Sequence, residues 1–265
     1  MRDLLRLAGL CVTLAAIAMG GCGPPAPGGD PLAPPELEQF ARSLDRAAPP
    51  TGLRGSGSGS LSGADRRTFF TFAALTDGEG WLRADLRPSS PAAPSGFTAQ
   101  LEIDGACARL YFPSTHTMVS DCLEDPPVDD LAPLLLGRID GGVVRRLRAP
   151  RLLVGEDTMQ LTGERDGVHL ELTLDAETLR LRRVEAEGPD EVWVTAEYEG
   201  HGWKESLPLP RVTVVRYGRS GRTHGRLRLE FDRLRRADDV DPTTHEIFVV
   251  PGSRELSWGD LTLWR

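Results

Sequence analysis

Apolar and polar residues alternate in steps of two along most of the chain, which is the pattern of half-buried β-strands. The clearest case runs from Val168 to Asp175, where every second position is valine or leucine until the final aspartate. We expect about ten to twelve such strands, joined by short turns in antiparallel order. Their ranges are 53–62, 68–75, 81–86, 97–103, 106–112, 117–123, 168–175, 179–181, 192–198, 212–217, 225–231 and 247–249, with an edge strand within 256–264.

Residues 53–62 consist almost entirely of alternating glycine and serine, so they could form a flexible linker, a phosphate-binding loop or a strand. A phosphate-binding loop follows a strand and opens a helix, whereas here strand-like sequence follows. We favour a strand, because small side chains allow other groups to approach the face of a sheet closely. At Arg182-Arg183 the alternation breaks in the way that a β-bulge would break it.

Two helical patterns interrupt the strands. An amphipathic helix is predicted from about Pro35 to the Pro49-Pro50 pair, with its apolar stripe at Leu37, Phe40, Ala41 and Leu44. A short apolar helix is predicted within Val128 to Gly137, capped by Asp130. This second helix is too short to cross a membrane. Its apolar residues still have to be buried, and we expect them to plug the concave side of the sheet.

The N-terminus has the layout of a bacterial lipoprotein signal. It contains Arg2 and Arg6, an apolar run at 7–18, and Gly20-Gly21 directly before Cys22. We therefore expect residues 1–21 to be a signal peptide and Cys22 to be the lipid attachment site, although Met19 stands where such signals usually carry Leu, Val or Ile. The alternative is an ordinary secreted protein cut near Gly21, with Cys22 as a spare thiol. A membrane-spanning anchor is disfavoured, because spanning requires about 20 apolar residues.

Composition then divides the remainder of the chain. Residues 22–35 are rich in proline, alanine and glycine, and we expect them to form a tether. Residues 36–265 are expected to form one domain. Its predicted fold class is mainly β: a single curved antiparallel sheet that forms an unclosed half-barrel, with an N-terminal helix and a short plug helix.

Two cysteines fall within this domain. If the strand ending at Phe112 turns through residues 113–116 and returns from Thr117, then Cys107 faces Cys122. Opposed cysteines in such a pair can form a disulfide, which an exported compartment permits. Two separately buried thiols are the alternative.

Charge and candidate chemistry mainly exclude functions. The formal net charge is −8, which disfavours nucleic acid as a partner. Basic clusters at 145–151 and 233–236 lie near acidic residues, so we favour a solvated surface over lipid headgroup binding. The five histidines show no metal-binding or catalytic spacing, and Gly55 to Gly59 does not form a nucleophile elbow. We expect no enzyme activity, no cofactor and no metal.

The order of these parts resembles the LolA/LolB family of periplasmic lipoprotein carriers, in particular its uncharacterised lipoprotein branch. The resemblance spans residues 36–234 and includes Leu53-Arg-Gly, Leu-Leu-Leu-Gly at 134–137, and the alternating stretch 218–236. It implies an unclosed β-sheet whose hollow, partly plugged by helices, holds acyl chains. The implied partners are the membrane, through the lipid anchor, the acyl chains of a lipid or lipoprotein, and a periplasmic carrier protein. Gly23 follows Cys22 where aspartate would retain an enteric lipoprotein at the inner membrane, so we expect the outer membrane.

We expect one face of each strand to line this hollow. The candidate lining residues are Phe70, Phe72, Trp81, Leu101, Ile103, Leu134, Leu135, Leu172 and Trp193. Plain core packing is the alternative for these residues. The loop from Pro88 to Ser95 lacks the large apolar residue that the family's outer-membrane receptor uses to deliver cargo, so the resemblance supports acyl-chain binding more than insertion. An envelope interaction protein with a self-filled sheet is the alternative function.

Overall fold

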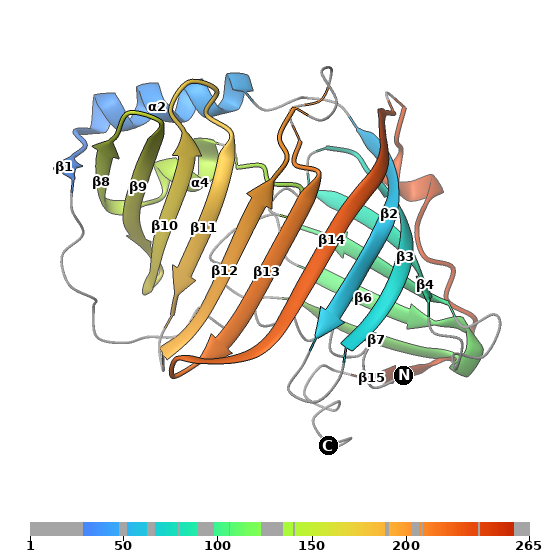
Figure 1. Ribbon diagram of the computed structural model, residues 1–265. Coiled ribbons are helices and arrows are strands. Elements are labelled where there is room, and N and C mark those ends of the chain that lie inside the picture. The colour runs from blue at the N-terminus through green and yellow to red at the C-terminus, as the bar shows by residue number, and fades with distance from the viewer. Residues whose placement is uncertain are drawn as a thin grey trace.

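The described residues form one open sheet of fifteen strands in the order β1-β8-β9-β10-β11-β12-β13-β14-β2-β3-β4-β5-β6-β7-β15 (Figure 1). This computed structural model describes residues 29–47, 52–62, 67–78, 80–89, 98–105, 107–122, 135–139, 141–188, 191–202, 207, 209–237 and 239–256. The sheet has two wings that meet where β14 pairs with β2. We call β2 to β7 the N-terminal wing and β8 to β14 the C-terminal wing.

The N-terminal wing is a meander of neighbouring strands. Its strands are β2 (Leu53–Ser62), β3 (Arg67–Thr76), β4 (Trp81–Pro88), β5 (Ala99–Asp104), β6 (Cys107–Phe112) and β7 (Thr117–Cys122), with a short 3-10 helix at Pro113–Thr115. The β6–β7 hairpin has the predicted register, because Phe112 pairs with Thr117 and Cys107 pairs with Cys122. The glycine-serine stretch is a strand, as predicted.

The C-terminal wing is a second meander. Its strands are β8 (Arg148–Val154), β9 (Thr158–Arg165), β10 (Val168–Asp175), β11 (Leu181–Glu187), β12 (Val192–Glu199), β13 (Val212–Arg219) and β14 (Arg222–Arg236). The predicted bulge at Arg182-Arg183 is confirmed: Leu174 pairs with Leu181 while Thr173 pairs with Arg183.

Short strands from the two ends of the described chain lie at the two edges of the sheet. β1 (Asp30–Pro31) pairs with β8, so the last part of the predicted tether belongs to the sheet. β15 (Arg254–Leu256) pairs with β7 in parallel, which corrects the expectation of a wholly antiparallel sheet. The strands β1, β8 and β9 were not predicted, and residues 247–249 are not a strand although one was expected there.

The predicted amphipathic helix is α2 (Pro34–Ala47), and it packs against a short helix, α4 (Gly141–Arg145), that was not predicted. Together they bury Ala41, Leu44, Val143 and Val144 in the main core. Asp45 accepts a hydrogen bond from the Gly141 N–H (2.7 Å) and pairs with Arg145 (2.8 Å), which fixes the two helices together. Within the described ranges, no helix is long and apolar enough to cross a membrane.

The main core lies on the concave face of the sheet. Alternation in the strands places Leu161, Leu172 and Leu174 there with no exposed surface, which confirms the period-two pattern of the C-terminal wing. The outer, convex face of that wing carries charged pairs, such as Arg216 with Glu197 (2.7 Å). One face is therefore buried and the other is charged, as for an antiparallel sheet with one solvated side.

Residues 239–256, which we call the C-terminal segment, cover the part of the outer face of the N-terminal wing around Trp81, Arg83 and Tyr111. The Arg83 guanidinium donates hydrogen bonds to the carbonyl oxygens of His245 (2.6 Å) and Glu246 (3.2 Å). The Val250 N–H points to the Tyr111 hydroxyl (3.4 Å). Because these backbone groups bond to side chains of the sheet, residues 247–249 extend over it without joining a strand ladder.

Candidate functional site

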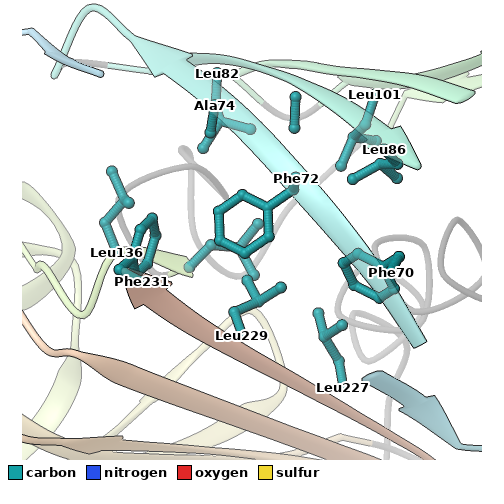
Figure 2. A pocket seen from close by; sticks show the side chains of 12 residues that line it. Phe70, Phe72, Ala74, Leu82, Leu86, Leu101, Leu136, Leu227, Leu229 and Phe231 are labelled. Atoms are coloured by element: carbon teal, nitrogen blue, oxygen red, sulfur yellow. The ribbon is translucent and has the colours of Figure 1, made fainter. Parts of the chain in front are cut away.

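The concave face holds a cavity of about 50 Å³ near the junction of the two wings. Among the residues that the structure describes, all of its lining side chains are phenylalanine, leucine or alanine. They are Phe70, Phe72, Ala74, Leu82, Ala84, Leu86, Leu101, Leu135, Leu136, Leu227, Leu229 and Phe231. In Figure 2 the Phe72 ring lies near the centre of this group, and Phe231 lies toward its left side.

The strand β2 supplies room for these rings, because glycine occupies three successive concave-face positions between Leu53 and Leu61. A Cβ atom on Gly59 would lie 2.5 Å from the Phe70 ring, and one on Gly57 would lie 2.0 Å from the Glu230 carbonyl oxygen. Only glycine allows so close an approach. The role expected for the small residues of this strand is thus observed.

Aromatic rings from two strands cover the glycine positions. Phe72 and Phe231 both pair with Gly57, from opposite sides of β2. Their ring centroids are 5.2 Å apart and their planes are nearly perpendicular, at 88°. This edge-to-face arrangement is favourable, and the two rings occupy space that the glycines leave open.

Residues 135–139, which we call the plug segment, bridge the two wings beside the cavity. On the C-terminal wing, the fully buried Thr213 hydroxyl donates to the carbonyl oxygen of Leu135 (3.2 Å). On the N-terminal wing, the Arg138 guanidinium donates to the carbonyl oxygen of Gly78 (2.7 Å). Leu135 and Leu136 reach the cavity between these two attachments.

The predicted plug helix coincides only partly with this segment. Residues 128–134, including Leu134, lie outside the described residues. The described part, residues 135–139, contributes buried Leu135, Leu136 and Ile139 to the core.

Four of the predicted lining residues border the cavity, namely Phe70, Phe72, Leu101 and Leu135. Ile103 pairs with the lining residue Leu82, so it lies on the same face but does not border the cavity. Leu172 is fully buried in the core of the C-terminal wing, where the cavity does not extend.

Two tryptophans lie on the outer face, which corrects their expected place in the hollow. Trp81 alternates with the lining residues Leu82 and Ala84, so its side chain points away from the cavity. Its indole N–H donates to the nearly buried Glu102 carboxylate (3.0 Å). Trp193 alternates with the core residue Val194 and lies against Gly218 of the next strand.

Most of the remaining lining residues could be recognised only after the strands were aligned. Leu82 and Leu86 share one face of β4, and the register of β4 with β5, which places Ala84 opposite Leu101, shows that this face lines the cavity. By contrast, Leu227, Leu229 and Phe231 reach the site through the β14–β2 pairing, which joins segments far apart in the chain.

Other candidate features form no site in the described residues. The five histidines lie on separate segments, and no group of metal ligands occurs among the residues that the structure describes. Arg145 of the first basic cluster pairs with Glu38 (2.8 Å), and both Nε and Nη2 of Arg151 donate to the Gly29 carbonyl oxygen. His201 is half-buried, and desolvation lowers the pKa of its imidazole.

The fold and cavity define an open β half-barrel with an apolar concave site and an N-terminal helix, which is the fold class predicted from the sequence. Neither a protein-family model nor a curated protein matches the sequence.

Solved structures with a similar fold include a DUF1329 family protein from Desulfovibrio piger, with a TM-score of 0.55, 11% identity, and coverage of 82% of this chain and 98% of that chain. A LolA superfamily protein from Nitrosomonas europaea gives a TM-score of 0.48 at 15% identity, covering 78% of this chain and 97% of that chain. An outer membrane lipoprotein-sorting protein domain from Vibrio parahaemolyticus gives a TM-score of 0.49 at 12% identity, covering 78% of this chain and 94% of that chain. At these identities the likeness concerns the fold, so function has to be argued from the site.

Proposed function

We propose that the concave cavity binds the acyl chains of a lipid or lipoprotein. The observation that carries this proposal is the composition of the cavity wall, whose described lining residues are all Phe, Leu or Ala. Such a wall offers no hydrogen bond to water or to a polar ligand, so a hydrocarbon is the ligand it fits. Burial of an acyl chain stabilises the complex by about 25 cal/mol per Å² of apolar surface removed from water, and this value does not depend on the headgroup that carries the chain.

Uptake requires the cavity to enlarge. At about 50 Å³ it is smaller than ligand sites, which measure about 300–1,000 Å³. The Phe72 and Phe231 rings can rotate away from the glycines of β2, and the plug segment can move when the bond between Thr213 and Leu135 breaks. We interpret the structure as the closed member of such an equilibrium, which a bound acyl chain would shift.

The proposal includes a location for the protein. Residues 1–21 would be removed as a signal peptide, lipidated Cys22 would anchor the protein to the outer membrane facing the periplasm, and residues 36–265 would form the binding domain. Cys22 lies outside the described residues, so the support comes from the pattern around it. In this setting a periplasmic carrier protein is the partner that would deliver acyl chains.

Binding and membrane insertion are separate activities in this proposal. The loop from Pro88 to Ser95 contains no large apolar side chain, and residues 90–97 lie outside the described part of the chain. We therefore propose that the protein receives and holds acyl chains, and we assign it no insertion step.

A pair of substitutions on one strand tests the binding site. Ala74 lines the cavity, whereas the neighbouring Ala73 is exposed on the other face of β3. Ala74→Leu should fill the cavity and weaken the binding of a fluorescent fatty acid, while Ala73→Leu adds the same carbons outside and should leave binding unchanged. Equal affinity in both variants, with folding confirmed by circular dichroism, would show that the cavity is not the site.

Thr213→Val tests the opening step. It keeps the shape of the side chain but removes the hydroxyl that holds Leu135, so the plug segment should open more readily. We expect faster fatty-acid uptake in stopped-flow fluorescence. An unchanged rate would exclude this opening route.

The second candidate is an envelope interaction protein whose hollow is filled by its own side chains. The small volume of the cavity favours it. Native mass spectrometry of the domain purified from membranes distinguishes the two functions. Co-purified lipid supports the first, and its absence together with no fatty-acid binding supports the second.

A further inference from the structure

Two consecutive apolar side chains protrude at the end of β8. Leu153 is 46% exposed and Val154 is 64% exposed, and they directly precede the turn into β9. We call these two residues the β8 tip. Other exposed large apolar residues in the described ranges lie elsewhere, such as Phe69, over which the Arg67 guanidinium packs (4.7 Å), and Phe248 in the C-terminal segment.

The N-terminal chain joins the folded domain beside the β8 tip. Asp30 pairs with Leu152, and a Cβ atom on Gly29 would lie 3.0 Å from the Leu152 carbonyl and 3.1 Å from the Leu153 nitrogen. The Arg151 guanidinium holds the Gly29 carbonyl oxygen from two nitrogens, at 3.0 and 2.7 Å. The point where the tether meets the sheet is thus fixed next to the exposed pair.

The length of the tether limits how far this point lies from the membrane. Cys22 precedes Gly29 by seven residues. Because an extended chain spans at most 3.3–3.6 Å per residue, Gly29 lies within about 25 Å of the lipidated residue. Of the exposed apolar groups in the described ranges, the β8 tip therefore lies next to the point where the tether from the lipidated residue reaches the sheet.

We propose that the β8 tip docks on the surface of the bilayer in which Cys22 is anchored. The inference rests on the lipid attachment that is part of the proposed function. Two apolar side chains bind a bilayer only weakly by themselves, but a short tether makes the contact intramolecular and raises its effective concentration. Docking then fixes the orientation of the half-barrel on the membrane.

The charges around the β8 tip indicate which lipids it prefers. Asp30, Glu156 and Asp157 are all exposed beside it and outnumber the nearby Arg151, whose guanidinium keeps its positive charge while it donates to the Gly29 carbonyl oxygen. Carboxylates are repelled by an anionic surface over distances of about 10 Å at moderate salt. The contact is therefore apolar in nature and suits a zwitterionic surface.

The test uses the lipidated protein reconstituted in phosphatidylcholine vesicles. It measures how deeply a probe on the protein enters the bilayer. An environment-sensitive fluorophore is placed on Val154→Cys, and on Phe248→Cys as a matched exposed apolar position remote from the tether. The parent chain treated in the same way gives the labelling blank. We expect a blue shift and quenching by nitroxide-labelled lipids at position 154 but not at 248, and weaker quenching in vesicles rich in phosphatidylglycerol.

Equal quenching at the two positions, or none at 154, would overturn the docking proposal. Fatty-acid binding measured on the same samples separates this failure from failure of the cavity, because the β8 tip and the cavity share no residue. Mass spectrometry that finds Cys22 without lipid would overturn the docking while leaving acyl-chain binding intact.

Discussion

The two wings of the sheet are built from similar meanders but differ in how many faces they bury. In the C-terminal wing, the outer face carries ion pairs, such as Arg183 with Glu185 (2.8 Å). In the N-terminal wing, the outer face buries Trp81, Glu102 and Tyr111 on the side that the C-terminal segment covers. Alternation in a sequence shows which residues share a face. It identifies the core face only where the other face is exposed to solvent and therefore carries polar residues.

The difference between the wings also decides where a cavity can form. The C-terminal wing fills most of its concave face with apolar side chains, among which Leu161, Leu172 and Leu174 have no exposed surface. In the N-terminal wing the glycines of β2 leave space that phenylalanine rings fill incompletely. The following predictions test this comparison, from the largest expected effect to the smallest.

Leu172→Ala should lower the free energy of unfolding by about 2–5 kcal/mol, because it opens a hole in a fully packed core. Leu229→Ala should cost less, about 1–2 kcal/mol, because Leu229 already borders a cavity and keeps some exposure. Urea denaturation of both variants measures the difference. Equal costs would mean that the core is packed as tightly beside the cavity, at the junction of the wings, as it is around Leu172.

Reduction of a Cys107–Cys122 disulfide should destabilise the N-terminal wing by about 3 kcal/mol, the value for a closed loop of about 15 residues. The register places the two residues directly opposite each other, and the bond is our prediction from that pairing. Non-reducing mass spectrometry after alkylation in denaturant checks it, with the Cys107→Ser/Cys122→Ser double variant as the control. Alkylation of both thiols without reductant would contradict the prediction.

Trp81→Phe should lower the free energy of unfolding by about 1–3 kcal/mol, because it removes the indole donor to Glu102, a side chain only 3% exposed. Trp193→Phe changes a half-buried indole on the outer face of the other wing. It should alter the free energy of unfolding by no more than about 0.5 kcal/mol. Thermal unfolding of the pair gives the readout. A larger effect at Trp193 would reverse our assignment of the covered face.

Asp175→Asn should destabilise the protein at neutral pH by about 1 kcal/mol. Asp175 accepts hydrogen bonds from Arg182 and from the Thr178 N–H, and these lower the pKa of its carboxyl well below the ordinary value. A depressed pKa stabilises the fold above the unfolded-state value near 4, and the contribution is lost as the pH falls below it. The variant and the parent should therefore converge in acid-unfolding curves, and a constant difference at all pH values would count against this role.

Much of the fold could be predicted because local patterns determine it. The β6–β7 register follows from the turn between Phe112 and Thr117, and the bulge follows from the extra arginine at Arg182-Arg183. β8 was not predicted because Pro150 interrupts its sequence, and proline in a strand is tolerated mainly at sheet edges. The parallel pairing of β15 joins distant segments and leaves no local signal.

The candidate site was only half predictable for the same reason. Phe70, Phe72 and Leu101 were assigned from their own strands, where alternation suffices. Trp81 was misplaced because a tryptophan among apolar neighbours suggests a hollow, whereas the C-terminal segment buries this part of the outer face. Phe231 was missed because the pairing of β14 with β2 cannot be derived from either strand alone.

The short strands at the ends of the described chain also affect how the protein behaves at high concentration. An unclosed sheet presents unpaired backbone groups along both rims, and such rims recruit other chains into aggregates. Here the two residues of β1 pair with one rim, at β8, and the three residues of β15 pair with the other, at β7. Short strands near both ends of the described residues thus block part of each rim, which reduces the backbone surface open to edge-to-edge association between copies.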